Sequence, residues 1–222
     1  MCIRDRYLED QIARSLSNLG LETIVLYYLH NIETQLLVVN AAVFRERLAR
    51  AIGVLEAQAR AGRIAAWGLA TWDGLRAPPE HPDHLSLQDV LALAEETAGK
   101  GHHFRAVQLP SNLAMPQAAV YRSQETPQGR QPAMAAARAL GLAAFGSASI
   151  LQGRLSGDLP DHIAEVFPGL ETSAQRALQF ARSVPGATTA LVGVSSPEHA
   201  AENFALAGVV PAEPEQVVEA LS

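Results

Sequence analysis

The stretch Thr-Ile-Val-Leu-Tyr-Tyr-Leu-His-Asn-Ile-Glu occupies residues 23–33 and decides the fold class. Its first seven residues are β-branched, aromatic or aliphatic, a run typical of a parallel strand buried on both faces. The run stops at His30 and Asn31. Folds built on parallel strands place their chemistry beyond the carboxyl ends of those strands, so His30 is a candidate functional residue. Considered alone, a histidine in this position is more often a strand-terminal ring that bonds a neighbouring carbonyl, and only the rest of the sequence favours a functional role.

Apolar periodicity divides the rest of the chain into alternating helices and short strands, which predicts a parallel sheet. Successive predicted strand ends lie 37–47 residues apart, a step that suits a (β/α)8 barrel. We therefore predict an α/β fold, a partial TIM barrel of about five parallel strands that forms one incomplete domain over residues 1–222. An open doubly wound sheet is the alternative, although no Gly-x-Gly-x-x-Gly turn follows any strand. The predicted strands are 23–29, 65–70, 105–109, 142–146 and 189–192; the predicted helices are 7–19, 42–61, 87–98, 131–140, 172–183, 197–207 and 211–221.

Composition excludes several classes of protein. The net charge of −6 argues against binding to nucleic acid or to a membrane surface. The one cysteine, Cys2, excludes a disulfide framework and favours a cytoplasmic location. No metal site is expected, because His102 and His103 have no carboxylate at ligand spacing. The first six residues lead directly into a helical pattern, so we expect an incomplete domain in which residues 1–6 are foreign sequence.

Five stretches, in order, resemble the C-terminal two-thirds of an aldo/keto reductase. They are GLETIVLYYLHNIE at 20–33, GRIAAWGLATWD at 62–73, VQLPSNL at 107–113, LQGRLSG at 151–157 and LVGVSSPEHAAEN at 191–203. The resemblance implies a TIM barrel that binds NADP(H) and transfers hydride to a carbonyl carbon. A tyrosine tuned by a lysine and an aspartate donates the proton in that family, and a histidine after the fourth strand orients the carbonyl.

His30 matches that histidine, and we predict that it is catalytic. The strands that carry the family's Asp, Tyr and Lys are absent from the sequence. Tyr27 and Tyr28 lie inside a strand, Tyr121 falls in a polar loop and Lys100 follows a helix end, so none of them is assigned to the proton donor group.

The resemblance also implies a set of cofactor contacts. Thr71 and Gln108 match residues that hold the nicotinamide carboxamide, although the family's Ser-Asn pair is Ala70-Thr71 here. His199 replaces the family's arginine at the adenosine 2′-phosphate, so NADP(H) is the expected cofactor and NAD(H) stays open. The remaining predicted cofactor residues are Ser147, Ala148, Ile150 and Gln152 near the pyrophosphate, Gly193, Ser195 and Ser196 at a helix start, and Glu202 and Asn203 at the adenine.

Two functions of different classes follow. The first is an NADP(H)-dependent oxidoreductase that reduces small aldehydes or ketones in the complete protein, with the present chain truncated and inactive. The second is a non-catalytic nucleotide-binding or interaction protein on the same half-barrel. A hydrolase or aldolase has less support, because no paired carboxylates follow the strands and the only lysine, Lys100, is badly placed for a Schiff base. The oligomeric state is not predicted.

Overall fold

The computed structural model describes residues 3–222, with side chains from Arg6 onward, so Cys2 and the start of the segment expected to be foreign lie outside the described residues. Its strands form one parallel five-stranded sheet in the order β1-β2-β3-β4-β5. This confirms the predicted α/β fold and the number of strands. The strands are β1 (Ile24–His30), β2 (Ile64–Ala70), β3 (Phe104–Pro110), β4 (Ala143–Ser147) and β5 (Thr189–Ala190).

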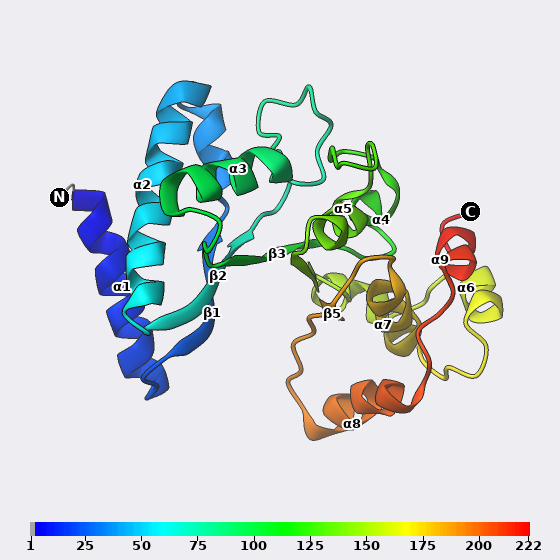
Figure 1. Cartoon of the computed structure of the whole chain (residues 1–222). Helices are drawn as coiled ribbons and strands as arrows, with labels where there is room; N and C mark the ends of the chain where they lie inside the picture. Colours follow the sequence, from blue (N-terminus) through cyan, green and yellow to red (C-terminus); the bar gives the residue numbers. More distant parts are fainter. Residues whose placement is uncertain (1–2) are drawn as a thin grey trace. The chain divides into compact units, whose positions relative to one another are not determined.

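Helices connect the strands, and Figure 1 labels most of them. None of the helices in residues 3–222 is long and apolar enough to cross a membrane. They are α1 (Ile3–Leu19), α2 (Ala41–Arg60), α3 (Leu87–Ala98), α4 (Gln117–Val120), α5 (Ala133–Ala139), α6 (Asp161–Val166), α7 (Ser173–Ser183), α8 (Pro197–Ala205) and α9 (Pro214–Glu219), with 3-10 turns η1 (Ile32–Leu37), η2 (Leu151–Ser156) and η3 (Leu206–Gly208).

Local signals explain where several helices begin. The hydroxyl of Ser86 accepts a hydrogen bond from the backbone N–H of Asp89 at 3.2 Å and caps α3. Thr172 and Gln175 form a reciprocal capping box at the start of α7. Pro197 occupies the first turn of α8, where its missing N–H costs nothing.

Three local expectations were wrong. β1 is not buried on both faces: Val25 is 78% exposed, so the face of β1 that carries this side chain is uncovered within the described residues. β5 is shorter than the predicted strand 189–192. The helices α4 and α6 were not predicted, because segments of four and six residues are too short to show a helical period.

The chain divides into two compact units, and the division falls inside β3. The N-terminal unit ends at Val107 and the C-terminal unit begins at Gln108. The expected single domain over 1–222 therefore remains a prediction, and each unit is described by itself.

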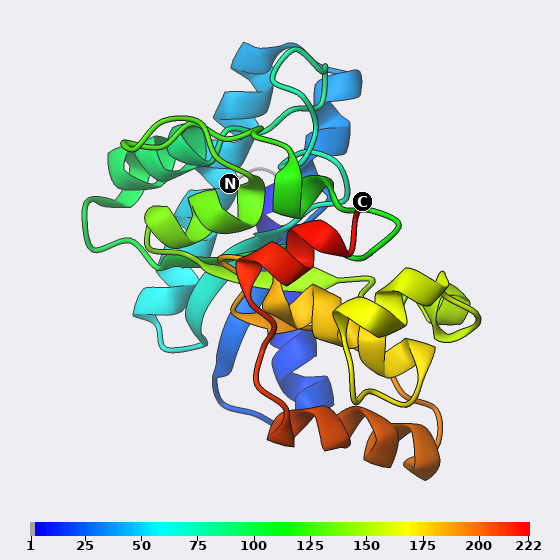
Figure 2. The same ribbon diagram turned by 90° about the vertical axis from the view of Figure 1, so that its right-hand side faces the viewer.

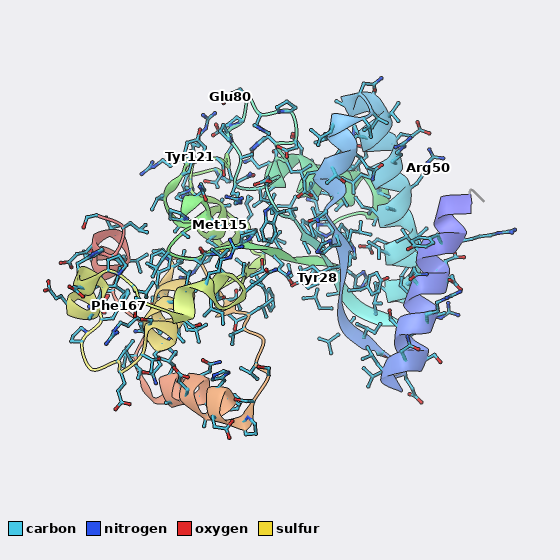
Figure 3. All side chains as sticks on the ribbon, turned by 180° about the vertical axis from the view of Figure 1, so that it is seen from behind. Tyr28, Arg50, Glu80, Met115, Tyr121 and Phe167 are labelled. Carbon is cyan, nitrogen blue, oxygen red and sulfur yellow. The ribbon has the colours of Figure 1, made fainter. Side chains whose placement is uncertain are left out.

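In the N-terminal unit, α2 packs on both α1 and β2 (Figure 1). Trp67 on β2 is fully buried and stacks on Phe104 with ring centroids 4.6 Å apart. Gly68 permits the close approach of its neighbours: a Cβ there would lie 2.5 Å from the carbonyl oxygen of Ala106 and 2.8 Å from the ring of Tyr28, which Figure 3 labels on β1.

In the C-terminal unit, α7 is the central helix and contacts η2, β5, α8 and α9; Figure 2 shows these elements from the side. Ala177, Phe180 and Ala181 are fully buried along its inner face. Gly186, which follows α7, has φ +94°, and a Cβ there would lie 2.3 Å from the carbonyl oxygen of Met134. Only glycine fits this tight turn before β5.

Candidate functional site

His30 is the last residue of β1, and its side chain is exposed at the carboxyl end of the strand. Its Cα pairs in register with Ala70, the last residue of β2. The next residue, Asn31, has left-handed backbone (φ 49°), and its N–H donates to the carbonyl oxygen of Ala70 at 2.6 Å. The strand therefore ends in a sharp turn that leaves the His30 ring available to a ligand.

Glu33, three residues after His30, was missed by the sequence analysis. It is only 2% exposed, and its Oε1 accepts from the backbone N–H of Trp72 at 2.7 Å and of Asp73 at 3.4 Å. Its Oε2 is buried and has no hydrogen-bond partner among the described residues. Glu33 thus ties the segment after β1 to the segment after β2.

Thr71, predicted to contact the cofactor, directly follows β2 and is 4% exposed. Its Oγ1 is buried and has no partner within the described part of the chain. The next residue, Trp72, is 45% exposed, and its backbone N–H is bonded to Glu33. Two buried polar atoms without partners, Glu33 Oε2 and Thr71 Oγ1, therefore occur beside the ends of paired strands, where a polar ligand or water could satisfy them.

A second polar cluster lies within the N-terminal unit. Glu56 on α2 is 1% exposed, and its Oε1 accepts from the Trp67 indole at 2.7 Å and from the His103 backbone N–H at 2.6 Å. Its Oε2 lies 2.8 Å from Nδ1 of His103. Burial alone raises the pKa of Glu56, but these hydrogen bonds outweigh burial and lower it. His103 thus has a carboxylate partner that sequence spacing does not show, because Glu56 lies 47 residues earlier in the chain.

No tyrosine of β1 is suited to donating a proton. Burial raises the pKa of Tyr27, with a further contribution from the nearby Tyr7. Burial raises the pKa of Tyr28 to about 12. Tyr121 is 39% exposed and Lys100 is exposed, as expected for surface residues.

In the C-terminal unit, the segment after β3 is fastened to the segment after β4. Asn112 is fully buried; its Oδ1 accepts from the backbone N–H groups of Ala114 and Met115, and its Nδ2 donates to the carbonyl oxygen of Ala148 at 2.9 Å. The N–H of Ser111 donates to the carbonyl oxygen of Ser147. The predicted cofactor residue Gln108 is half-buried within β3. The sequence analysis missed Asn112, although it lies in one of the matched stretches.

The segment after β4 has unusual backbone geometry. Ala148, Leu151 and Gln152 all have positive φ, between 46° and 55°. Such conformations are uncommon outside glycine and cost about 1–3 kcal/mol each. The buried hydroxyl of Ser149 helps to hold the segment by donating to the carbonyl oxygen of Leu191 at 2.8 Å. This hydrogen bond attaches the strained segment to the residue that follows β5. Backbone strain of this kind is frequent at ligand sites.

A cavity of about 660 Å³ opens between this segment, the residues after β5 and α8. Its size is within the usual range for small-molecule sites. It brings together most of the predicted cofactor residues of the C-terminal unit, but not Gln108, Ser147 or Ser196. The predicted residues that line it are Ala148, Ile150, Gln152, Gly193, Ser195, His199, Glu202 and Asn203.

Hydrogen bonds hold in place the part of the cavity wall that α8 forms. Glu202 on α8 accepts from the hydroxyl of Thr172, and its backbone carbonyl accepts from the Gln175 side chain at 3.3 Å. Ser196 caps α8 by accepting from the N–H of His199 at 3.2 Å. The sequence analysis missed Thr172 as a lining residue, because its role as a helix cap gave no sign of a partner on α8. Among the side chains of residues 6–222, no three from His, Cys, Asp or Glu gather closely enough to hold a metal ion.

Comparisons with known proteins establish the fold. No protein-family model and no curated protein matches the sequence. Solved structures are similar. An aldo-keto reductase from Bacillus halodurans in its holo form matches at 16% identity with a TM-score of 0.63, over 97% of this chain and 66% of that one.

Two further structures give the same result. An aldo/keto reductase from Klebsiella pneumoniae in complex with NADP and acetate matches at 20% identity with a TM-score of 0.64, over 96% of this chain and 63% of that one. A thermostable aldo-keto reductase in complex with the inhibitor epalrestat matches at 14% identity with a TM-score of 0.65, over 96% and 65%. The chain thus has part of the (β/α)8 fold of these reductases and spans less than two-thirds of their length.

Proposed function

We propose that the chain is the dinucleotide-binding part of an oxidoreductase of the aldo/keto reductase type, which reduces small aldehydes or ketones to alcohols. The observation that carries the proposal is the cavity of about 660 Å³, which gathers Ser195, His199, Glu202 and Asn203 with the strained segment after β4. NADP(H) or NAD(H) is the proposed cofactor; one of the similar structures contains NADP. A cytoplasmic location is part of the same proposal and rests on the single cysteine.

The donors and acceptors of the cavity suit a dinucleotide. Exposed Ser195, before α8, and the backbone N–H groups of Ile150 and Gln152 can bind phosphate oxygens. Asn203 and Glu202 can pair with the adenine amino edge, which needs acceptors beside a donor. Gln108 offers both a donor and an acceptor for a carboxamide. When bound, the dinucleotide supplies the hydride.

His30 would act on the substrate. Its exposed ring can donate a hydrogen bond to a carbonyl oxygen and stabilise the negative charge that develops there. The bond between Asn31 and Ala70 holds the end of β1, so the ring is presented from a rigid support. Glu33 orders the neighbouring segment that carries Thr71.

The described residues offer no proton donor to complete this chemistry. The raised pKa values of Tyr27 and Tyr28 keep both phenols protonated and poorly acidic, and the only lysine is exposed after α3. We therefore propose that the 222-residue chain binds dinucleotide but does not by itself reduce carbonyls.

Calorimetric titration of the folded chain with NADP⁺ and NAD⁺ tests this. We expect one binding site, together with no oxidation of NADPH or NADH by simple aldehydes. Circular dichroism would show whether the chain is folded. A folded chain that binds neither dinucleotide would contradict the proposal.

The alternative is a non-catalytic nucleotide-binding protein on the same fold, and the departures from the family's residues at Ala70-Thr71 and His199 favour it. The two proposed functions differ in the role that they give to His30. If the chain belongs to a reductase, the dinucleotide-loaded chain should bind a small carbonyl ligand, and His30→Ala should abolish that binding while leaving dinucleotide binding unchanged. Absence of carbonyl binding in the unsubstituted chain would favour the alternative.

A further inference from the structure

The charge of the cavity in the C-terminal unit bears on which dinucleotide it takes. Among its lining residues there is no lysine or arginine. His199 is the one lining side chain able to carry a positive charge, and Glu202 is the one carboxylate. The additional 2′-phosphate of NADP(H), with about two negative charges, would therefore meet little compensating positive charge on entering the cavity.

Hydrogen bonds within the protein hold Glu202 at the cavity wall, so its side chain is restrained from turning away from a ligand. One of its carboxylate oxygens, Oε1, accepts from the Thr172 hydroxyl, and its backbone carbonyl accepts from Gln175. The other carboxylate oxygen can accept a hydrogen bond from a ligand. A carboxylate that accepts from the adenine amino group still repels a phosphate placed near it, whereas an arginine would attract that phosphate.

The first turn of α8 also disfavours the binding of an additional phosphate. The N–H of His199 is already bonded to the Ser196 hydroxyl at 3.2 Å. Hydrogen bonds from the backbone N–H of Glu198 itself and from Ser196 lower the pKa of the Glu198 carboxyl beside the helix start. The N–H of His199, one donor that an anion could use, is thus engaged within the protein.

We infer that this cavity binds NAD(H) more tightly than NADP(H), and that Glu202 and His199 determine the preference. The inference rests on the proposed function, because it assumes that the cavity holds the adenosine end of a dinucleotide. Arg154 is the nearest cation along the chain: it lies in η2 between the lining residues Gly153 and Ser156, but it is exposed and does not line the cavity.

The test is calorimetric titration of the full 222-residue chain with NAD⁺, NADP⁺ and ADP-ribose. We expect NADP⁺ to bind about tenfold more weakly than NAD⁺, the difference expected for one unfavourable charge contact. Equal affinities, or tighter binding of NADP⁺, would overturn the inference and leave the proposed function standing. Failure of all three probes to bind a folded chain would instead remove the proposed function, and the preference with it.

Substitutions then test whether His199 and Glu202 determine the preference between the two dinucleotides. His199→Arg should strengthen NADP⁺ binding about tenfold and leave NAD⁺ unchanged. The matched control is His162→Arg, which introduces the same charge on α6 outside the lining residues and should change neither affinity. Glu202→Gln should narrow the difference between the two dinucleotides, which gives a second measurement if His199→Arg does not fold. An unchanged ratio in both variants, or NADP⁺ binding that depends on Arg154 in an Arg154→Ala variant, would contradict the assignment.

Discussion

Two sets of polar residues, one in each unit of the chain, differ in exposure and in their partners. In the N-terminal unit, Glu33 and Glu56 are almost fully buried and bond to protein groups from distant segments. In the C-terminal unit, Ser195 and His199 are exposed, and Asn203 is half-exposed, around a cavity. The comparison indicates that polar residues of the first kind hold segments together, whereas those of the second kind are available to a ligand.

The strongest test of this contrast is Glu56→Ala. The change leaves the Trp67 indole and the His103 backbone N–H without their acceptor, and we expect a loss of about 3 kcal/mol in the free energy of unfolding. Urea denaturation measures it. Glu46→Ala is the matched control: Glu46 is on the same helix and pairs with Arg50 at the surface, so its loss should cost about 0.5 kcal/mol or less. Equal effects of the two changes would refute the structural role of Glu56.

Glu33→Ala should have the next largest effect, about 2 kcal/mol, because it removes a buried acceptor from two backbone N–H groups at the end of β2. Its consequence should also be local. Hydrogen exchange should become faster at Trp72 and Asp73, which lose their acceptor, while the amides of α2 keep their protection. Unchanged exchange at both positions would mean that Glu33 does not order this segment.

Asn203→Ala should behave in the opposite way to Glu56→Ala. We expect about tenfold weaker dinucleotide binding, equivalent to about 1.4 kcal/mol, with little change in stability. Phe204→Ala, on the same helix but 76% exposed and outside the cavity lining, is the control and should leave affinity unchanged. A loss of stability without a loss of affinity in Asn203→Ala would remove the distinction between the two kinds of polar residue.

The pH dependence of stability should show the smallest effect. Because the pKa of Glu56 is lower in the folded chain than its ordinary value of 4.5, its contribution is fully present above pH 4.5 and is lost as the pH falls through the lower folded value. Thermal unfolding of the unsubstituted chain and of Glu56→Gln between pH 3 and 6 would show it as a component absent from the variant. Identical profiles would indicate that the hydrogen bonds to Glu56 do not depend on its charge.

Much of the fold was predictable, because strands and helices are encoded over a few neighbouring residues. The apolar run that ends at His30 and the capping residues Ser86 and Thr172 each signal an element through contacts within three or four positions. The exposed side of β1 was not predictable, since burial depends on what covers a strand. The cavity residues were recognised through matched stretches, but nothing in those stretches shows which of them share one cavity.

The order of helices and strands, and the position of His30 at a strand end, therefore follow from the sequence, because backbone conformation responds to local patterns of apolar and capping residues. The partners of Glu33, Glu56, Asn112 and Glu202 follow only from the folded chain. Those partners lie 39, 47, 36 and 30 residues away along the chain, and no local pattern specifies contacts at such separations. Such contacts form when packing brings distant segments together and a buried polar group must find a partner.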